Sequence, residues 1–227
     1  MSFLLNKYET IKQELALQNV TIVAVSKTKP AEDIIEAYQA GHLDFGENYV
    51  QELTDKYEVL PKNIRWHFIG HLQSNKVKYI APFVHLIHGV DSEKLLLEIN
   101  KQGAKLNRVI PCLLQIHISA EETKFGLDES ELETIIAKIS ADPTAYKHVS
   151  VTGLMGMASF TEDNNLIISE FKKLKKLFEE SKTQLSIINY PFNTLSMGMS
   201  ADYRFAIEQG STMIRIGSML FGSRINQ

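Results

Sequence analysis

Short apolar runs alternate with longer amphipathic stretches along the whole chain. The run Val20–Ser26 is continuous and rich in β-branched residues, which is typical of a strand buried on both faces. The stretch Phe3–Leu17 has nearly helical spacing, and Pro30 and Gly41 mark the start and end of a second helix. Further strands are predicted over residues 43–47, 64–69, 84–90, 109–118, 148–155, 193–196 and 213–216. Further helices are predicted over residues 49–58, 75–80, 92–102, 129–140, 164–183 and 201–209.

Eight predicted strands with a helix in nearly every gap indicate repeated βα units, which require parallel strands. Eight such units in 227 residues have the size of a (β/α)8 TIM barrel. An open doubly wound sheet is the alternative, but no G-x-G-x-x-G turn follows the first predicted strand. Since no linker or shift in composition divides the chain, we expect one α/β domain over residues 1–227.

Composition restricts the class of protein further. The 24 Lys and Arg residues nearly balance the 27 Asp and Glu residues, so no basic excess indicates nucleic acid or an anionic membrane as a partner. The single cysteine, Cys112, lies in an apolar run and suits a reducing compartment. The sequence has neither a signal-peptide pattern nor an apolar run of about 18 residues, so we expect a cytoplasmic protein.

Lys27 is the first candidate for chemistry. By the two-residue period of a strand it shares a face with Val23 and Val25. If these valines fill a barrel interior, Lys27 points into the mouth at the C-terminal strand ends. Desolvation there favours the neutral amine, which can form a Schiff base with an aldehyde. The alternative is a lysine that only caps the rim of the barrel, with its ammonium group in water.

The loops after the seventh and eighth predicted strands contain glycine and serine where barrels commonly bind phosphate. Ser196 and Gly198 belong to the first loop, and Gly217 and Ser218 stand before a short predicted helix in the second. Glycine lets backbone N–H groups approach an anion, and a helix N-terminus adds partial positive charge. Either loop alone is compatible with an ordinary turn, whereas the two together favour a phosphate site.

Arg215 lies on the eighth predicted strand, and inside a barrel mouth its guanidinium requires an acceptor. A ring nitrogen, a carboxylate or a phosphate of a ligand would serve. The alternative is a salt bridge to a buried carboxylate of the protein itself. The candidates for that carboxylate are Asp44, Glu47 and Asp202.

Histidines cluster near the third and fourth predicted strands, so a metal site is a further alternative. His67 and His71 share strand parity, and His85 and His88 follow them. However, no H-x-H ends the first strand and no H-E-x-x-H motif occurs. The pattern therefore does not favour a metal centre.

Seven stretches, in order along nearly the whole chain, resemble the pyridoxal phosphate homeostasis proteins. They are Val23–Pro30, Phe45–Glu52, Trp66–Lys76, Lys124–Leu127, Gly153–Met157, Leu195–Asp202 and Gly210–Gly217. That family is similar to the N-terminal barrel of alanine racemase and of eukaryotic ornithine decarboxylase. The resemblance implies a single (β/α)8 barrel of this type, the fold type III of proteins that bind pyridoxal 5′-phosphate (PLP).

The resemblance also implies a role for each candidate residue. Lys27 would hold PLP as an internal aldimine, a Schiff base, and Arg215 would approach the pyridine nitrogen. The residues expected at or near the phosphate are Ser196, Gly198, Ser200, Thr212, Gly217 and Ser218. The residues expected along the ring are Asn48, His67 and Met155.

Two functions are compatible with such a barrel. One is a carrier that sequesters PLP and delivers it to PLP-dependent apo-enzymes, with indirect effects on amino-acid metabolism. The other is a small racemase- or decarboxylase-like enzyme that acts on amino acids. The chain ends at Gln227 without the second domain that completes the racemase site and dimer, and a charged Arg215 disfavours a protonated ring nitrogen. We therefore expect a monomeric PLP carrier without substantial turnover.

Overall fold

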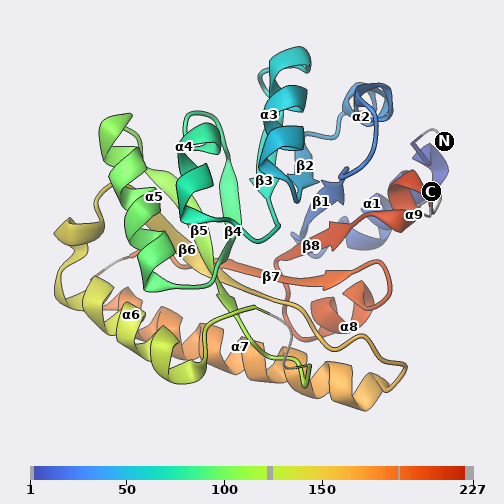
Figure 1. Ribbon diagram of the computed structural model, residues 1–227. Helices are drawn as coiled ribbons and strands as arrows, with labels where there is room; N and C mark the ends of the chain where they lie inside the picture. Colours follow the sequence, from blue (N-terminus) through green and yellow to red (C-terminus); the bar gives the residue numbers. More distant parts are fainter. Residues whose placement is uncertain (1–2, 122–124, 189, 223–227) are drawn as a thin grey trace.

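The eight strands form one closed parallel barrel in the computed structural model, which describes residues 3–121, 125–188 and 190–222. Each strand pairs with the next along the chain, and β8 pairs with β1, which closes the barrel (Figure 1). The fold is therefore the predicted (β/α)8 barrel and not the open doubly wound sheet. The strands are β1 (Thr21–Val25), β2 (Asp44–Glu47), β3 (Arg65–Phe68), β4 (Leu86–Val90), β5 (Ile110–Ile116), β6 (Val149–Gly156), β7 (Thr194–Met199) and β8 (Met213–Ile216).

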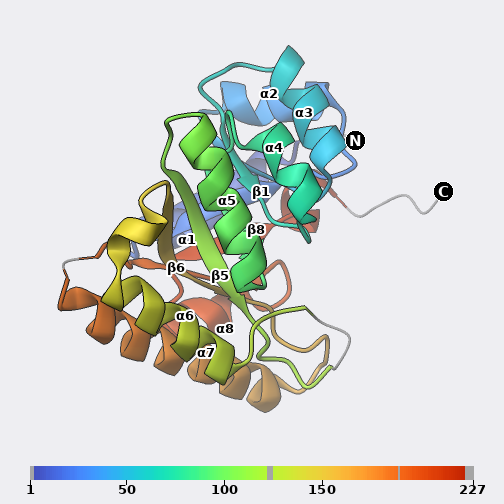
Figure 2. The ribbon, with the colours of Figure 1, turned by 60° about the vertical axis from the view of Figure 1, so that its left-hand side comes forward.

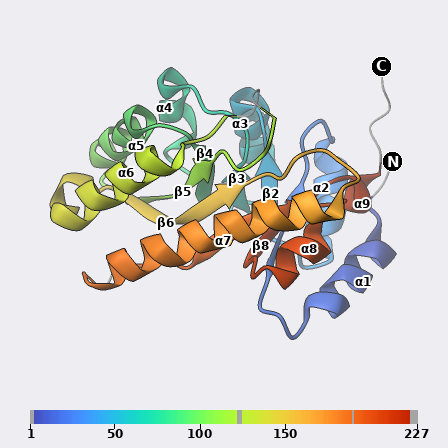
Figure 3. The ribbon, with the colours of Figure 1, turned by 90° about the horizontal axis from the view of Figure 1, so that it is seen from below.

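Helices connect the strands on the outside of the barrel, in the predicted alternation. They are α1 (Leu5–Leu15), α2 (Ala31–Gln39), α3 (Val50–Val59), α4 (Val77–Ile80), α5 (Glu93–Lys105), α6 (Glu129–Ala141), α7 (Asn164–Ser186), α8 (Tyr203–Glu208) and α9 (Ser218–Phe221), with short 3-10 helices η1 (Ser74–Lys76) and η2 (Pro143–Tyr146). Figure 2 shows α5 against the β4–β6 side of the barrel, and Figure 3 shows α6 beside the long helix α7. Among the described residues, no helix combines the length and apolar character needed to cross a membrane.

The helix α1, which precedes the first strand, lies between α2 and α8 in the outer ring. The Phe3 N–H donates to Glu36 of α2 at 2.9 Å, and the hydroxyl of Tyr203 in α8 donates to Glu14 of α1 at 3.0 Å. The short helix α9 also contacts α1 (Figure 1). The first and last helices therefore complete the ring together.

The core has two parts, an outer shell and the barrel interior. The shell lies between strands and helices and includes the fully buried rings of Phe45, Trp66 and Phe68. The interior contains an apolar cluster of Val23, Leu86, Leu113, Met155 and Met213. Val23 therefore faces inward, as strand parity predicts. The interior also contains polar side chains, which need partners because water does not reach them.

The single cysteine is fully buried, as the apolar run around it predicts. Burial raises the pKa of the Cys112 thiol far above its ordinary value, so the thiolate is not formed at neutral pH. Cys112 is therefore a core residue and not a reactive group.

Candidate functional site

A cavity of about 630 Å³ lies over the C-terminal ends of the strands. Its walls come from the ends of β1, β2, β3, β6, β7 and β8 and from the loops that follow them. Lys27 is half-buried in this mouth, where strand parity places it. The predicted site residues that line the cavity are Lys27, Asn48, Ser200, Arg215, Gly217 and Ser218.

A buried ion pair holds the backbone just before Lys27. The hydroxyl of Ser26 donates to Glu47 Oε1 at 2.6 Å, and Lys56 Nζ donates to the same oxygen at 2.7 Å and to the Ser26 carbonyl at 2.8 Å. Burial raises the pKa of Glu47 to about 7, although the nearby ammonium of Lys56 opposes the shift. Ser26, Glu47 and Lys56 therefore fix the point from which the Lys27 side chain starts.

A second contact holds the backbone just after Lys27. Thr28 has a φ of 63°, a left-handed conformation that is uncommon for a residue other than glycine. Its N–H donates to Glu52 Oε1 at 2.6 Å, and that oxygen also accepts from Lys56 at 2.7 Å. Sequence reasoning considered Glu47 only as a partner of Arg215 and did not single out Glu52 or Lys56. The available signal was the spacing of Glu52 and Lys56, which places opposite charges one helical turn apart on α3.

Arg215 projects from β8 into the floor of the cavity and is 4% exposed. Its Nη1 donates to Ser196 Oγ at 2.6 Å, and its Nη2 donates to the Gly156 carbonyl at 3.0 Å. The other N–H groups of Arg215 have no hydrogen-bond acceptor among the described residues. Burial lowers the pKa of Arg215 to about 10, so the guanidinium remains charged at neutral pH.

The buried carboxylates predicted as alternative partners of Arg215 have different surroundings. Asp44 pairs with Arg65, and Glu47 pairs with Lys56. Asp202 accepts from the N–H of Met199 at 2.6 Å, and its charge opposes the lowering of the pKa of Arg215. The hydrogen bonds of Arg215 thus go to a hydroxyl and a carbonyl, which leaves its charge available to a ligand.

Asn48 follows β2 and also lines the cavity. Its side-chain oxygen is buried and has no hydrogen-bond partner among the described residues. A buried acceptor without a donor costs about 1–3 kcal/mol. A ligand that donates a hydrogen bond here would remove that cost.

The loops after β7 and β8 meet at the cavity, as the sequence predicts. The Gly217 N–H and Ser200 Oγ form a hydrogen bond of 3.3 Å between the two loops. Ser218 lies beside them on the same wall. Hydroxyl groups and backbone N–H groups gathered in this way are suitable donors for a phosphate.

Five predicted site residues do not line the cavity. Strand β7 continues to Met199, beyond its predicted end, and so Ser196 and Gly198 lie within the strand and not in the loop. Ser196 is fully buried beneath Arg215. Gly198 has a φ of 97° and faces α8, where an added Cβ would lie 2.7 Å from the Cβ of Ala206.

The other three residues of this group lie elsewhere in the barrel, each for its own reason. Met155 lies within β6, which extends to Gly156, and belongs to the apolar cluster of the interior. His67 points into the interior from β3 and is 1% exposed, so it does not line the cavity. Thr212 precedes β8 and therefore lies at the opposite end of the strand from the cavity.

Beneath Arg215, the polar groups of the interior form a continuous chain. Ser196 Oγ lies 3.2 Å from His88 Nδ1, and His88 Nε2 lies 3.0 Å from His67 Nδ1. His67 Nε2 lies 3.0 Å from Asp44 Oδ1 at the start of β2. Burial lowers the pKa of His88 well below its ordinary value, so this imidazole is neutral.

Asp44, at the far end of this chain, also pairs with the half-exposed Arg65. Arg65 Nε donates to Asp44 Oδ1 at 2.7 Å, and its Nη2 donates to Oδ2. Burial alone would raise the pKa of Asp44, but the hydrogen bonds from His67 and Arg65 hold it well below its ordinary range. Asp44 is therefore ionised at neutral pH.

Asp44, His67 and His85 present nitrogen and oxygen atoms within 4.8 Å of one another, which is close enough for a metal ion. Both oxygens of Asp44 are already bonded to Arg65, and both ring nitrogens of His67 are bonded. Asp44 and His67 are members of the polar chain, whereas His85 is not. His71 lies apart from it, 3.0 Å from Asp91.

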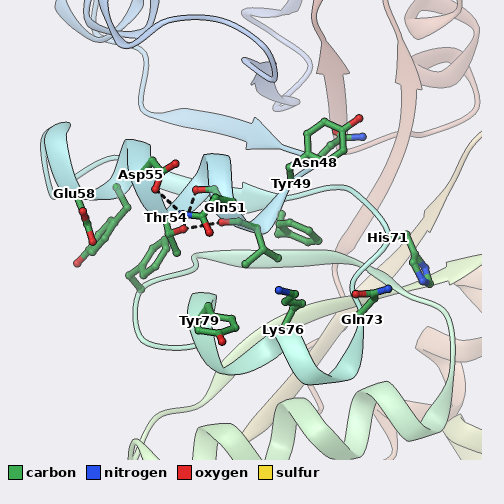
Figure 4. Close-up of a pocket in the computed structure, with 14 residues that line it drawn as sticks. Asn48, Tyr49, Gln51, Thr54, Asp55, Glu58, His71, Gln73, Lys76 and Tyr79 are labelled. Carbon is green, nitrogen blue, oxygen red and sulfur yellow. Dashed lines mark hydrogen bonds between the residues drawn. The ribbon is translucent and has the colours of Figure 1, made fainter.

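A second hollow of about 830 Å³ lies outside the barrel, between α3 and the segment η1–α4 (Figure 4). Tyr49, Lys76 and Tyr79 line it, and Asn48 borders both spaces. Its lining does not include Lys27 or Arg215. The charged groups at the strand ends therefore place the candidate site at the barrel mouth.

Comparisons with known proteins identify the family of the chain. The family described as alanine racemase, N-terminal domain, matches residues 2–225. A pyridoxal phosphate homeostasis protein of Vibrio alginolyticus is 40% identical over 223 residues, which cover 96% of this chain and 92% of that protein.

Solved structures with a similar fold agree with these sequence matches. PipY of Synechococcus elongatus, solved with PLP bound, is 32% identical with a TM-score of 0.85, over 96% of this chain and 99% of that one. An alanine racemase of Streptomyces coelicolor is 12% identical with a TM-score of 0.77, over 96% of this chain and 57% of that one. At this identity the racemase shares the fold alone.

Proposed function

Because the chain belongs to the family of the pyridoxal phosphate homeostasis proteins, we propose that it binds PLP at the barrel mouth and takes part in the homeostasis of this cofactor. The observation that carries the proposal is the presence of Lys27 and Arg215 in one cavity at the C-terminal strand ends. An amine and a buried guanidinium at one site suit a ligand with an aldehyde and an acceptor nitrogen.

The other cavity residues also fit this cofactor. Asn48 offers a buried oxygen that needs a donor, which a ring hydroxyl would supply. Ser200, Gly217 and Ser218 offer hydroxyl and N–H groups for a phosphate. Ser196 does not line the cavity, and its role is to accept a hydrogen bond from Arg215 and so orient the guanidinium.

Lys27 is the residue proposed to hold the cofactor covalently. When bound, PLP supplies an aldehyde with which the ε-amino group of Lys27 forms a Schiff base, with loss of water. The contacts of Ser26 with Glu47 and of Thr28 with Glu52 hold Lys27 at the mouth for this purpose.

Carriage of the cofactor is proposed in preference to catalysis. Arg215 is charged and cannot accept a proton, so it disfavours protonation of a ring nitrogen beside it. Without that proton the ring withdraws electrons poorly, which weakens racemisation and decarboxylation. We propose a cytoplasmic, monomeric carrier that passes PLP to apo-enzymes. The alternative is a small racemase or decarboxylase of amino acids.

The test is an absorption spectrum of the purified protein with added PLP, before and after reduction with borohydride. We expect a visible band that reduction removes, with the label on the peptide that contains Lys27. Lys27→Ala should lose both the band and the label. Lys29→Ala is the matched control, because Lys29 also lines the cavity but donates to the Phe221 carbonyl. A protein that takes up no PLP would overturn the proposal.

Assays with free amino acids then separate the carrier from the enzyme. A carrier should show no steady-state turnover. A racemase or decarboxylase rate that Lys27→Ala abolishes would support the enzyme instead.

A further inference from the structure

The polar chain in the barrel interior connects the cavity to the opposite end of the barrel. Its members lie on five different strands, and all are at least nine-tenths buried. Successive polar atoms are separated by 2.6, 3.2, 3.0 and 3.0 Å. In order from the cavity, the members are Arg215, Ser196, His88, His67 and Asp44.

When each histidine ring carries one proton, the two ends of the polar chain determine the direction of every hydrogen bond in it. Arg215 can only donate, and the ionised carboxylate of Asp44 can only accept. His67 Nε2 must therefore carry a proton, which it donates to Asp44. In a neutral ring, His67 Nδ1 then accepts from His88 Nε2.

The same argument extends to the cavity. Because His88 Nε2 carries the proton of a neutral ring, His88 Nδ1 accepts from the Ser196 hydroxyl. The Ser196 oxygen in turn accepts from Arg215. When each ring carries a single proton, every donor thus points towards Asp44 and that proton lies on Nε2. Burial of His88, which disfavours its charged form, agrees with this arrangement.

We propose that this one-directional chain positions Arg215 for the cofactor. Asp44 fixes the tautomers of His67 and His88, and these orient the Ser196 hydroxyl so that its lone pair faces Arg215. With the opposite tautomer, His88 Nδ1 would donate to Ser196, whose oxygen would have to accept from both His88 and Arg215 and whose proton would lose its acceptor in the polar chain. Asp44, His67 and His88 are positioning residues, since none of them lines the cavity.

The tautomers of His67 and His88 follow from the hydrogen bonds of the polar chain alone, whereas the effect on PLP binding rests on the proposed function. Nitrogen NMR of the ¹⁵N-histidine-labelled protein without PLP tests the first part. In the wild type, we expect His67 and His88 to have a protonated Nε2 and a bare Nδ1. In Asp44→Asn the new amide can donate as well as accept, so both rings should show mixed tautomers. Asp91→Asn is the control, because Asp91 contacts only His71 among the histidines and lies outside the chain.

PLP titration of the same variants tests the second part. Asp44→Asn should weaken PLP binding about 3- to 30-fold although it does not touch the cavity, and Asp91→Asn should change it less than about twofold. Ser196→Ala interrupts the polar chain with a smaller change, because it removes one hydroxyl and leaves the ion pair of Asp44 and Arg65 intact. It should weaken binding by a similar factor and should leave the His67 tautomer unchanged, even if Asp44→Asn fails to fold.

The outcomes separate this inference from the proposed function. Wild-type rings with a protonated Nδ1, or unchanged PLP affinity in Ser196→Ala, would overturn the inference while PLP binding still stands. A wild type that shows the expected tautomers but takes up no PLP would overturn the link to the cofactor and the proposed function together.

Discussion

Hydrogen-bond partners decide the protonation of the two buried carboxylates on β2. Glu47 and Asp44 are both buried carboxylates on β2, yet the pKa of Glu47 is raised and that of Asp44 is lowered. The difference lies in their partners. Asp44 receives donors from Arg65 and His67 on both oxygens, whereas Glu47 has one oxygen that is buried without a partner among the described residues. Of these two carboxylates, Glu47 is therefore the one that titrates near neutral pH.

This difference predicts a pH dependence of stability. The pKa of Glu47 is about 7 in the folded protein and 4.5 ordinarily, so between these values the folded state binds the proton more tightly. Stability from this group is therefore lost as the pH rises through the range, by on the order of 2 kcal/mol. Urea unfolding across the range should show this loss in the wild type and a smaller loss in Glu47→Gln.

The exposed Glu58 on the same helix as Lys56 provides the control for that comparison. Glu58→Gln should keep the wild-type pH dependence. Equal slopes in the wild type and Glu47→Gln would show that Glu47 is not the group that titrates.

At the scale of elements, the alternation of strands and helices was predictable because the local spacing of apolar residues indicates each element. The exact strand ends were not, because pairing with neighbouring strands extends β7 to Met199 and β6 to Gly156. The extension of β7 accounts for the position of Ser196 and Gly198, whereas Met155 was already inside its predicted strand and lies in the apolar cluster of the interior. Strand parity located Lys27 correctly, since Val23 already identified the inward face.

The polar chain was less accessible to sequence reasoning. The sequence indicates the histidines near β3 and β4 as a possible metal site and Asp44 as a possible partner of Arg215. Their connection depends on which residues of different strands lie at the same height in the barrel, and no local pattern contains that information. The same holds for the ion pair of Glu47 and Lys56 beneath Lys27.

Gly198 gives a prediction at this scale, because it lets β7 approach α8. Gly198→Ala combines a φ of 97° with a Cβ contact of 2.7 Å, whereas Gly41→Ala has a φ of 86° and open space. We expect Gly41→Ala to lower the free energy of unfolding by about 1–2 kcal/mol. Gly198→Ala should lower it by a further 1–3 kcal/mol or so, because the helix must move. Urea unfolding of both variants measures the difference, and equal losses would contradict a close approach of α8.

At the scale of the whole molecule, the site joins segments from both halves of the chain. Lys27 and Asn48 come from the first two βα units, and Ser200, Arg215 and Gly217 come from the last two. A ligand held by both groups stabilises the closed barrel and not a fragment of it. Binding should therefore be visible in global unfolding.

PLP should raise the melting temperature of the protein. At a free concentration of about 100 times the Kd, a ligand that binds only the folded state adds about 2.7 kcal/mol, or several degrees for a chain of this size. The shift should be much smaller in Lys27→Ala and should persist in Lys29→Ala. Calorimetry with and without PLP provides the measurement, and an equal shift in Lys27→Ala would place the anchor elsewhere.

The closed strand order has a consequence for how the molecule assembles. Among the described strands, every neighbouring pair is also consecutive in the chain except β8 and β1. The pairing of β8 with β1 therefore has the largest entropic cost of bringing distant segments together. The Leu4 N–H also joins the two ends of the chain, because it donates to the Leu220 carbonyl at 2.8 Å. Lys27 follows β1 and Arg215 lies on β8, the two strands that pair there. The proposed cofactor site is thus complete only when the most non-local strand pair of the barrel has formed, and a ligand that contacts both residues would link the two ends of the chain.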